Sequence, residues 1–267
     1  MSSDEPSGKE MTFWDHLEDL RQGLIRSVAV LLVLSIVLFF FKNFIFDDII
    51  LAPTRSDFFL YKWLGVDVDL KIVNIEVAAQ FMIHIKVTCV CAVILACPYI
   101  LYEIWRFIAP ALYKHEIVAT RKAFLFASVL FYAGIAVGYT VVLPLMVNFF
   151  HGYSVSPQVE NTISLSSYMG TVTSTVLLFG IVFEFPTLIA ILSQIGLVTK
   201  QMLKSGWRYA VCVVVVLAAL ITPSGDPFSL CVVSVPLFIL YWISIAVCKA
   251  EVPEQSDEED PEEETAR

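Results

Sequence analysis

The sequence predicts an all-α polytopic membrane protein with six transmembrane helices. Of its 267 residues, 58% are hydrophobic and 16% are charged, and the mean hydropathy is +0.76. Soluble domains usually carry about a quarter charged residues and fewer than half apolar ones. Six apolar segments are long enough, or nearly long enough, to cross a bilayer as helices. The composition therefore argues against a water-soluble enzyme.

The six predicted spans cover residues 24–41, 80–107, 123–150, 169–193, 209–222 and 228–248. The fifth span is unusual because only a short apolar stretch separates Arg208 from the polar turn that begins at Pro223. As a helix it would measure ~21 Å, whereas the hydrocarbon core of a bilayer is ~30 Å thick. A helix this short either thins the bilayer or is shielded by its neighbours, and the sequence leaves both alternatives open.

The distribution of charge predicts the orientation. Twelve of the 17 Lys and Arg residues fall on the side that carries both termini, so that side is expected to be cytoplasmic. We expect no signal peptide, because residues 1–10 are acidic. Three parts are expected: a cytoplasmic N-terminal segment (1–23), a transmembrane domain (24–248) and a disordered acidic cytoplasmic tail (249–267).

Residues 13–24 predict an amphipathic helix that lies on the cytoplasmic membrane surface. Its polar side would present carboxylates to water, either for binding or as an ordinary solvated face. The apolar face comprises Phe13, Leu17, Leu20 and Leu24, and the opposite side carries Asp15, Glu18 and Asp19.

Two further acidic residues stand out by position. Glu116 lies in an otherwise basic loop after the second span, where it either pairs locally or binds a cationic ligand. Glu184 lies inside the fourth span, where an acid costs on the order of 3 kcal/mol. It is therefore a functional candidate, with capping of backbone groups freed by Pro186 as the alternative. Nucleotide, metal and nucleophile motifs are absent, so we expect no cofactor, metal or catalytic residue.

Six strings of residues occur in an order and at intervals that one membrane-protein family shares. They are HLEDLR (16–21), WRFIAPALYKHE (105–116), FYAGIAVGY (131–139), VVLPL (141–145), FGIVFEFP (179–186) and TPSGDPFS (222–229). Together they resemble TatC, the receptor subunit of the twin-arginine protein translocase, over residues 12–248. The resemblance implies a concave, glove-like bundle of six helices with both termini in the cytoplasm.

The resemblance also implies a function. Family members bind signal peptides with two consecutive arginines through two carboxylates, and the matching positions here are Asp19 and Glu116. Carboxylates suit this task because they accept a guanidinium bidentately. Glu184 matches an intramembrane Glu that is thought to contact the single-span partner subunits TatA and TatB. Export would be driven by the proton gradient across the plasma membrane, the inner membrane in Gram-negative cells, and several copies would assemble with these partners.

Some candidate positions depart from the family pattern. The family usually has Glu at the position of Asp19. As an alternative, the adjacent Glu18 shares the role of Asp19 or takes it over. Glu103 stands where Gln is common, and it either joins the signal-peptide site or pairs with Arg106. Arg21 completes the candidate signal-peptide site.

Other candidates are polar or structural. Asp226 joins Glu184 as an intramembrane polar or partner contact, although Leu230 replaces a Gln that often follows it. Gly134 and Gly138 form a G-x-x-x-G pair that suits close helix packing. Structural roles are expected for Pro53, Pro98, Pro110, Pro144 and Pro186.

Three hypotheses about the function remain open. The first is a receptor for folded-protein export with no reaction of its own. The second is an ion-coupled small-solute transporter with Glu184 as the proton site, and the third is an intramembrane enzyme. A transporter would show two similar halves and an enzyme would need a second catalytic group near Glu184. Neither pattern is present. The resemblance makes the receptor the main hypothesis, whereas the residues alone would narrowly favour the transporter.

Overall fold

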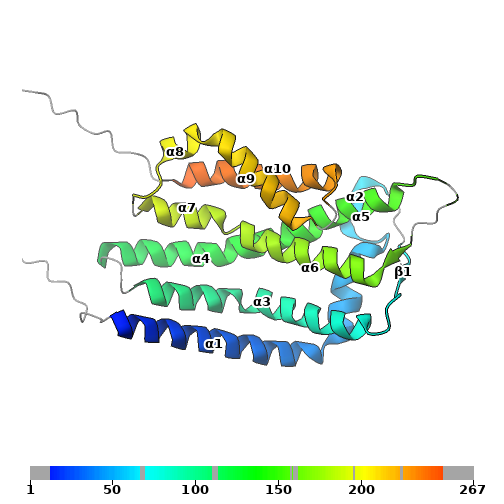
Figure 1. Ribbon diagram of the computed structural model, residues 1–267, viewed down its shortest axis with the longest axis horizontal. Helices are drawn as coiled ribbons and strands as arrows, with labels where there is room; N and C mark the ends of the chain where they lie inside the picture. The colour runs from blue at the N-terminus through cyan, green and yellow to red at the C-terminus, as the bar shows by residue number, and fades with distance from the viewer. Residues whose placement is uncertain are drawn as a thin grey trace, which may run out of the picture.

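The computed structural model describes residues 13–66, 70–109, 114–156, 158, 162–194, 196–222 and 225–248, with the backbone alone at residues 13, 15 and 114–123. The expected acidic tail and Pro110 lie outside these residues. The described chain is mostly helical, and its long helices lie side by side in a bundle (Figure 1).

Within the described residues, five helical segments are long and apolar enough to cross a membrane. They are α1 (Phe13–Phe39), α3 (Ala79–Ile108), α4 (Lys114–Val137) continued by the π-helical turn η4 (Gly138–Val142) and α5 (Leu143–Gly152), the pair α6 (Leu165–Val182) and α7 (Phe185–Gln194), and α10 (Pro227–Val247). A shorter apolar helix, α9 (Trp207–Ile221), occupies the position of the fifth predicted span. Its 15 residues form about 22 Å of helix, so the predicted shortness is confirmed.

The N-terminal segment differs from our expectation. We predicted a separate interfacial helix before the first span, but α1 runs without interruption from Phe13 to Phe39. Gly23 does not interrupt the helix, because it lies in a regular helical turn. The first turns of α1 therefore extend the span beyond its apolar part, and α1 packs along α3 at the edge of the bundle (Figure 1).

The chain between α1 and α3 folds against the end of the bundle opposite the start of α1 (Figure 1). It contains η1 (Phe44–Ile50), η2 (Ala52–Thr54), α2 (Phe59–Leu64) and β1 (Ile72–Val73). β1 pairs in parallel with β2 (Ile163–Ser164), in the register Ile72 to Ile163 and Val73 to Ser164.

Buried tyrosines form hydrogen bonds between this region and the helices. Tyr61 is fully buried and donates to the carbonyls of Pro53 at 2.9 Å and Pro144 at 3.4 Å. Burial raises the pKa of Tyr61, so its hydroxyl stays protonated and able to donate. Tyr168 of α6 donates to the carbonyl of Ile50 at 2.7 Å. Each buried hydroxyl thereby has a hydrogen-bond partner away from water.

Glycines set the packing of α4 against α6. A Cβ at Gly134 would lie 2.6 Å from the carbonyl oxygen of Phe179 and 2.7 Å from the side chain of Phe183. A Cβ at Gly138 would lie 3.0 Å from Phe179. The close packing predicted from the G-x-x-x-G pair is confirmed, because only glycine fits at Gly134 without displacing α6.

The described prolines that were expected to be structural lie in the first turn of a helix or, for Pro98, inside one. Pro53 opens η2, Pro144 lies in the first turn of α5, and Pro186 lies in the first turn of α7. Pro98 lies inside α3, which continues through it. The break between α6 and α7 falls between Val182 and Phe185, just before Pro186. Proline has no backbone N–H to donate to the preceding helical turn, which explains the break at this position.

Candidate functional site

Two contacts join the start of α1 to the end of α3. The ring of His16 stacks on Phe107 with centroids 4.2 Å apart. Farther along α1, Arg26 donates from Nε to Oε1 of Glu103 at 3.1 Å and from a terminal nitrogen to Oε2 at 3.0 Å. This is a bidentate ion pair between residues 77 positions apart. The contacts fix both the position of α1 along α3 and the face that it turns toward α3.

The Glu103 carboxylate is fully engaged. Tyr99, one turn earlier on α3, donates its hydroxyl to Oε1 at 2.8 Å. The Glu103 side chain is buried, whereas that of Arg26 is 39% exposed. A Cβ added at Gly23 would lie 3.4 Å from Oε2, at van der Waals distance, so this turn of α1 packs directly beside the carboxylate. The sequence left pairing with Arg106 open, but the partner is Arg26.

Asp19 and Glu18 lie on different sides of α1. His16, Asp19, Gly23 and Arg26 are spaced by three and four residues, so they share the face that contacts α3. Glu18 is about 200° around the helix from His16. It accepts from Arg21 at 3.2 Å in an exposed ion pair, and from Gln22 at 3.4 Å. Of the two adjacent acids, Asp19 therefore lies on the face turned toward the end of α3.

Glu116 lies on a helix rather than in a loop. We expected the third span to begin near residue 123, but α4 begins at Lys114, so Glu116 falls in its first turn. An acidic residue in the first turn is favourable because it faces the positive end of the helix dipole. Only the backbone of Glu116 is described. The helix start places this residue shortly after the end of α3.

Glu184 occupies the break between α6 and α7. Its carbonyl accepts from Leu188 at 2.9 Å, so Glu184 stands just before the first turn of α7. Its side chain is half-buried, and Oε1 has no hydrogen-bond partner among the described residues. The hydroxyl of Thr187, one turn later, is also without one there.

Asp226 has a structural task that the sequence did not identify. It is the N-cap of α10, and its side chain accepts from the backbone N–H of Ser229 at 2.8 Å. Such a cap satisfies one of the free N–H groups of the first helical turn. A contact with a partner subunit remains a proposal for this residue.

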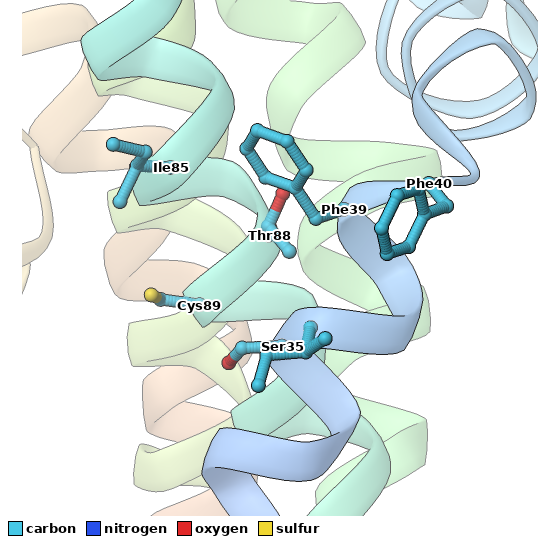
Figure 2. Close-up of a pocket in the computed structure, with 7 residues that line it drawn as sticks. Ser35, Phe39, Phe40, Ile85, Thr88 and Cys89 are labelled. Atoms are coloured by element: carbon cyan, nitrogen blue, oxygen red, sulfur yellow. The ribbon is translucent and has the colours of Figure 1, made fainter.

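One cavity lies between α1 and α3 but holds none of the candidate acids. Its volume is about 230 Å³, and it is lined by Ile36, Phe39, Phe40 and Ile85 with the small polar side chains of Ser35, Thr88 and Cys89 (Figure 2). The Thr88 hydroxyl already donates to the carbonyl of His84 at 2.7 Å. This cavity offers packing space rather than chemistry.

The structure thus brings some candidates together and separates others. Asp19, Glu103 and the start of α4 belong to one end of the bundle, where α1 begins and α3 ends (left in Figure 1). Glu184 lies farther along the bundle, at the α6–α7 break. Sequence reasoning missed Arg26 and Tyr99 as partners of Glu103. The spacing of Tyr99 and Glu103 by four residues was the one local signal for this network.

Comparison with known proteins gives consistent results. The family model described as "Sec-independent protein translocase protein (TatC)" matches residues 15–236. A protein of that name from Blattabacterium sp. subsp. Periplaneta americana is 36% identical over 253 residues, covering 89% of this chain and 95% of its own. A second, from Deinococcus radiodurans, is 34% identical over 236 residues, covering 88% and 85%. The crystal structure of a twin-arginine translocase receptor TatC superposes with a TM-score of 0.74 at 31% identity, covering 88% of this chain and 99% of that one.

The long apolar helices are those of a multi-pass membrane protein, and the matching relatives are components of a protein translocase, which places the chain in the transport class. The relatives make the class specific. The chain belongs to the TatC family, the receptor component of the twin-arginine, Sec-independent protein translocase. The resemblance drawn from the six strings is confirmed, and family membership favours the receptor over the solute transporter.

Proposed function

We propose that this protein binds the two consecutive arginines of signal peptides through Asp19 and Glu116 at the cytoplasmic face of the membrane. The observation that carries the proposal is the position of Asp19 between two contacts of α1 with α3. His16 stacks on Phe107 on one side of it, and Arg26 pairs with Glu103 on the other. Asp19 thereby faces the end of α3, which the first turn of α4 with Glu116 soon follows.

Two separate carboxylates suit two adjacent arginines. Each guanidinium offers a planar pair of donors to one carboxylate, whereas lysine offers only a point charge. Glu18 is a weaker candidate because Arg21 and Gln22 already donate to it. Asp19 is therefore the primary carboxylate of α1, where it is exposed on the side that His16 and Arg26 share.

Glu103 acts as a positioning residue rather than as a ligand. Both of its oxygens are occupied by Arg26, and Tyr99 donates to one of them as well. A signal arginine could reach this carboxylate only by displacing Arg26. The ion pair instead holds the start of α1 in the rotation that presents Asp19. Arg21 plays no direct part in this site, since its cation pairs with Glu18.

The topology proposed for this role has six spans with both termini in the cytoplasm. The start of α1 and the end of α10 lie at the same end of the bundle (Figure 1), and that end collects most of the Lys and Arg residues. Residues 1–23 and 249–267 flank the transmembrane domain on this side. The membrane is the plasma membrane, which in Gram-negative cells is the inner membrane.

Glu184 serves a later step, the contact with single-span TatA- and TatB-like subunits during export driven by the proton gradient. Oε1 of Glu184 is buried at the α6–α7 break and has no hydrogen-bond partner among the described residues, so a polar group of a partner helix would reach it by displacing neighbouring side chains. Asp226 is a second contact on this route, at the end of the short α9. Several copies of the chain and its partners would form the working assembly.

The test is binding of a labelled signal peptide to the purified full-length protein in nanodiscs. An Arg-Arg peptide should bind about tenfold or more tightly than its Lys-Lys counterpart, as expected for charge-assisted bidentate bonds. Asp19→Asn and Glu116→Gln should each reduce this preference, and the double variant should remove it. The matched control is Glu18→Gln, which removes a neighbouring acid on the opposite side of α1 and should leave the preference intact. Equal binding of the two peptides by the wild-type protein would overturn the proposal.

A further inference from the structure

A groove on the other side of the bundle has no part in signal-peptide binding. Its volume is about 320 Å³, and its walls come from α8 (Lys200–Ser205), α9, α10 and the α6–α7 break. Met202 and Leu203 line one wall, and Ala210, Val213 and Leu240 line the others. The hydroxyl of Tyr241, which also lines it, donates to the carbonyl of Leu203. The lining therefore favours a hydrocarbon occupant.

The groove opens sideways from the bundle. Among its lining residues, Tyr209 is 80% exposed, Met202 58% and Val213 52%. In a membrane these side chains of α8 and α9 face lipid, because acyl chains cover the lateral surface of a transmembrane bundle. The exposed aromatic rings of Trp207 and Tyr209 mark the headgroup level, where such amphipathic rings concentrate.

One end of this groove is basic. Between positions 185 and 222 the sequence holds Lys200, Lys204 and Arg208 and no acidic residue. Lys204 follows the lining residue Leu203, and Arg208 precedes Tyr209. Both side chains are exposed, and the guanidinium of Arg208 lies 5.8 Å from the centroid of the Trp207 ring. In a phospholipid, the phosphate lies above the acyl chains. Cations beside interfacial aromatic rings would contact the phosphate, while the apolar groove below them would hold an acyl chain.

We infer that this groove binds an anionic phospholipid, with one acyl chain between α8, α9 and α10 and the phosphate at Lys204 and Arg208. A protein helix is too large for this space. An α-helix with its side chains is about 10–12 Å across, so two turns of one occupy roughly 850 Å³. A single acyl chain is thin enough to enter, and the charge of the rim selects the headgroup. The short α9 would then have a lipid held beside it.

The test uses the full-length protein purified in detergent and incubated with phosphatidylglycerol or phosphatidylcholine of identical acyl chains. Native mass spectrometry counts the lipid retained. The wild-type protein should retain phosphatidylglycerol about fivefold or more over phosphatidylcholine, and Lys204→Gln with Arg208→Gln should abolish the difference. The matched control, Lys42→Gln with Lys62→Gln, removes two exposed lysines from the chain before and within α2 and should leave it unchanged.

A second variant tests the groove itself. Ala210→Phe fills the space between α9 and α10, so it should reduce retention of both lipids. Equal retention of the two lipids by the wild-type protein, or an unchanged preference in the Lys204/Arg208 variant, would overturn the proposal. A change of oligomeric state in Ala210→Phe with lipid retention unchanged would show that the groove contacts another protein chain instead. None of these readouts involves a signal peptide, so the result is independent of the function proposed above.

Discussion

Arg26 of α1 and Glu103 of α3 form a bidentate ion pair, with nitrogen–oxygen distances of 3.1 and 3.0 Å, at the end of the bundle where signal recognition is proposed. Tyr99 donates to the same carboxylate, and Gly23 packs beside it. The pair lies two helical turns from Asp19 on one face of α1. Its role is to hold that face against α3, so the positions of these side chains link helix packing to ligand binding.

Glu103→Gln should therefore lower both thermal stability and peptide affinity. The variant keeps the shape of the side chain but leaves the Arg26 cation without its partner, and the melting temperature should fall by about 3–6 °C. Thermal unfolding in detergent, followed by circular dichroism, measures the effect. The exposed pair of Glu18 and Arg21 provides the control, because Glu18→Gln should shift the melting temperature by about 1 °C or less.

The same variant separates positioning from direct binding. If Glu103 only positions α1, Glu103→Gln should weaken Arg-Arg and Lys-Lys peptides by similar factors, so their ratio survives. If Glu103 is itself a ligand, the ratio should fall as it does in Asp19→Asn. Peptide titrations of the two variants side by side distinguish these outcomes.

Glu184→Ala should leave signal-peptide binding within about twofold of the wild-type protein, because the break between α6 and α7 is far along the bundle from Asp19 and distant sites act independently. Export of a folded cargo with a twin-arginine signal should nevertheless fail in cells that carry this variant. Normal export would return Glu184 to a structural role, such as completing the first turn of α7.

Gly134→Ala should destabilise the bundle, because the added Cβ would lie 2.6 Å from the carbonyl oxygen of Phe179. Overpacking of this kind costs about 1–3 kcal/mol. Gly152→Ala is the matched control, since no atom lies within 4 Å of a Cβ at that position. Unfolding in increasing denaturant compares the two, and equal stability would show that α4 and α6 separate readily.

Much of the architecture could be predicted from the sequence because lipid imposes strong rules on apolar helices. The spans, the short α9 and the close packing at Gly134 follow from hydropathy and residue size. Helix boundaries were less predictable. Pro110 signals an end to α3, but nothing in the basic stretch after it shows that α4 resumes as early as Lys114. Likewise, α1 begins before its apolar part, because polar residues can form the same helix where the chain lies outside the membrane.

The candidate site was predictable residue by residue but not in its contacts. Asp19, Glu103 and Glu184 are visible as acids at unusual positions. The pairing of Glu103 with Arg26 is not, because the two residues are 77 positions apart and depend on how α1 rotates against α3. Arg106, only three residues from Glu103, was the nearer choice on local spacing. Packing of whole helices decided the partner.

The central claim, that two carboxylates read two arginines, is tested most directly by a double-mutant cycle. Affinities of Arg-Arg, Arg-Lys and Lys-Arg peptides are measured for the wild-type protein, Asp19→Asn and Glu116→Gln. The account predicts that each carboxylate couples to one arginine of the peptide. Replacing both the carboxylate and its arginine should then weaken binding no more than replacing either one alone. The expected coupling free energy is about 1.5–3 kcal/mol. Additive losses for every combination would contradict it.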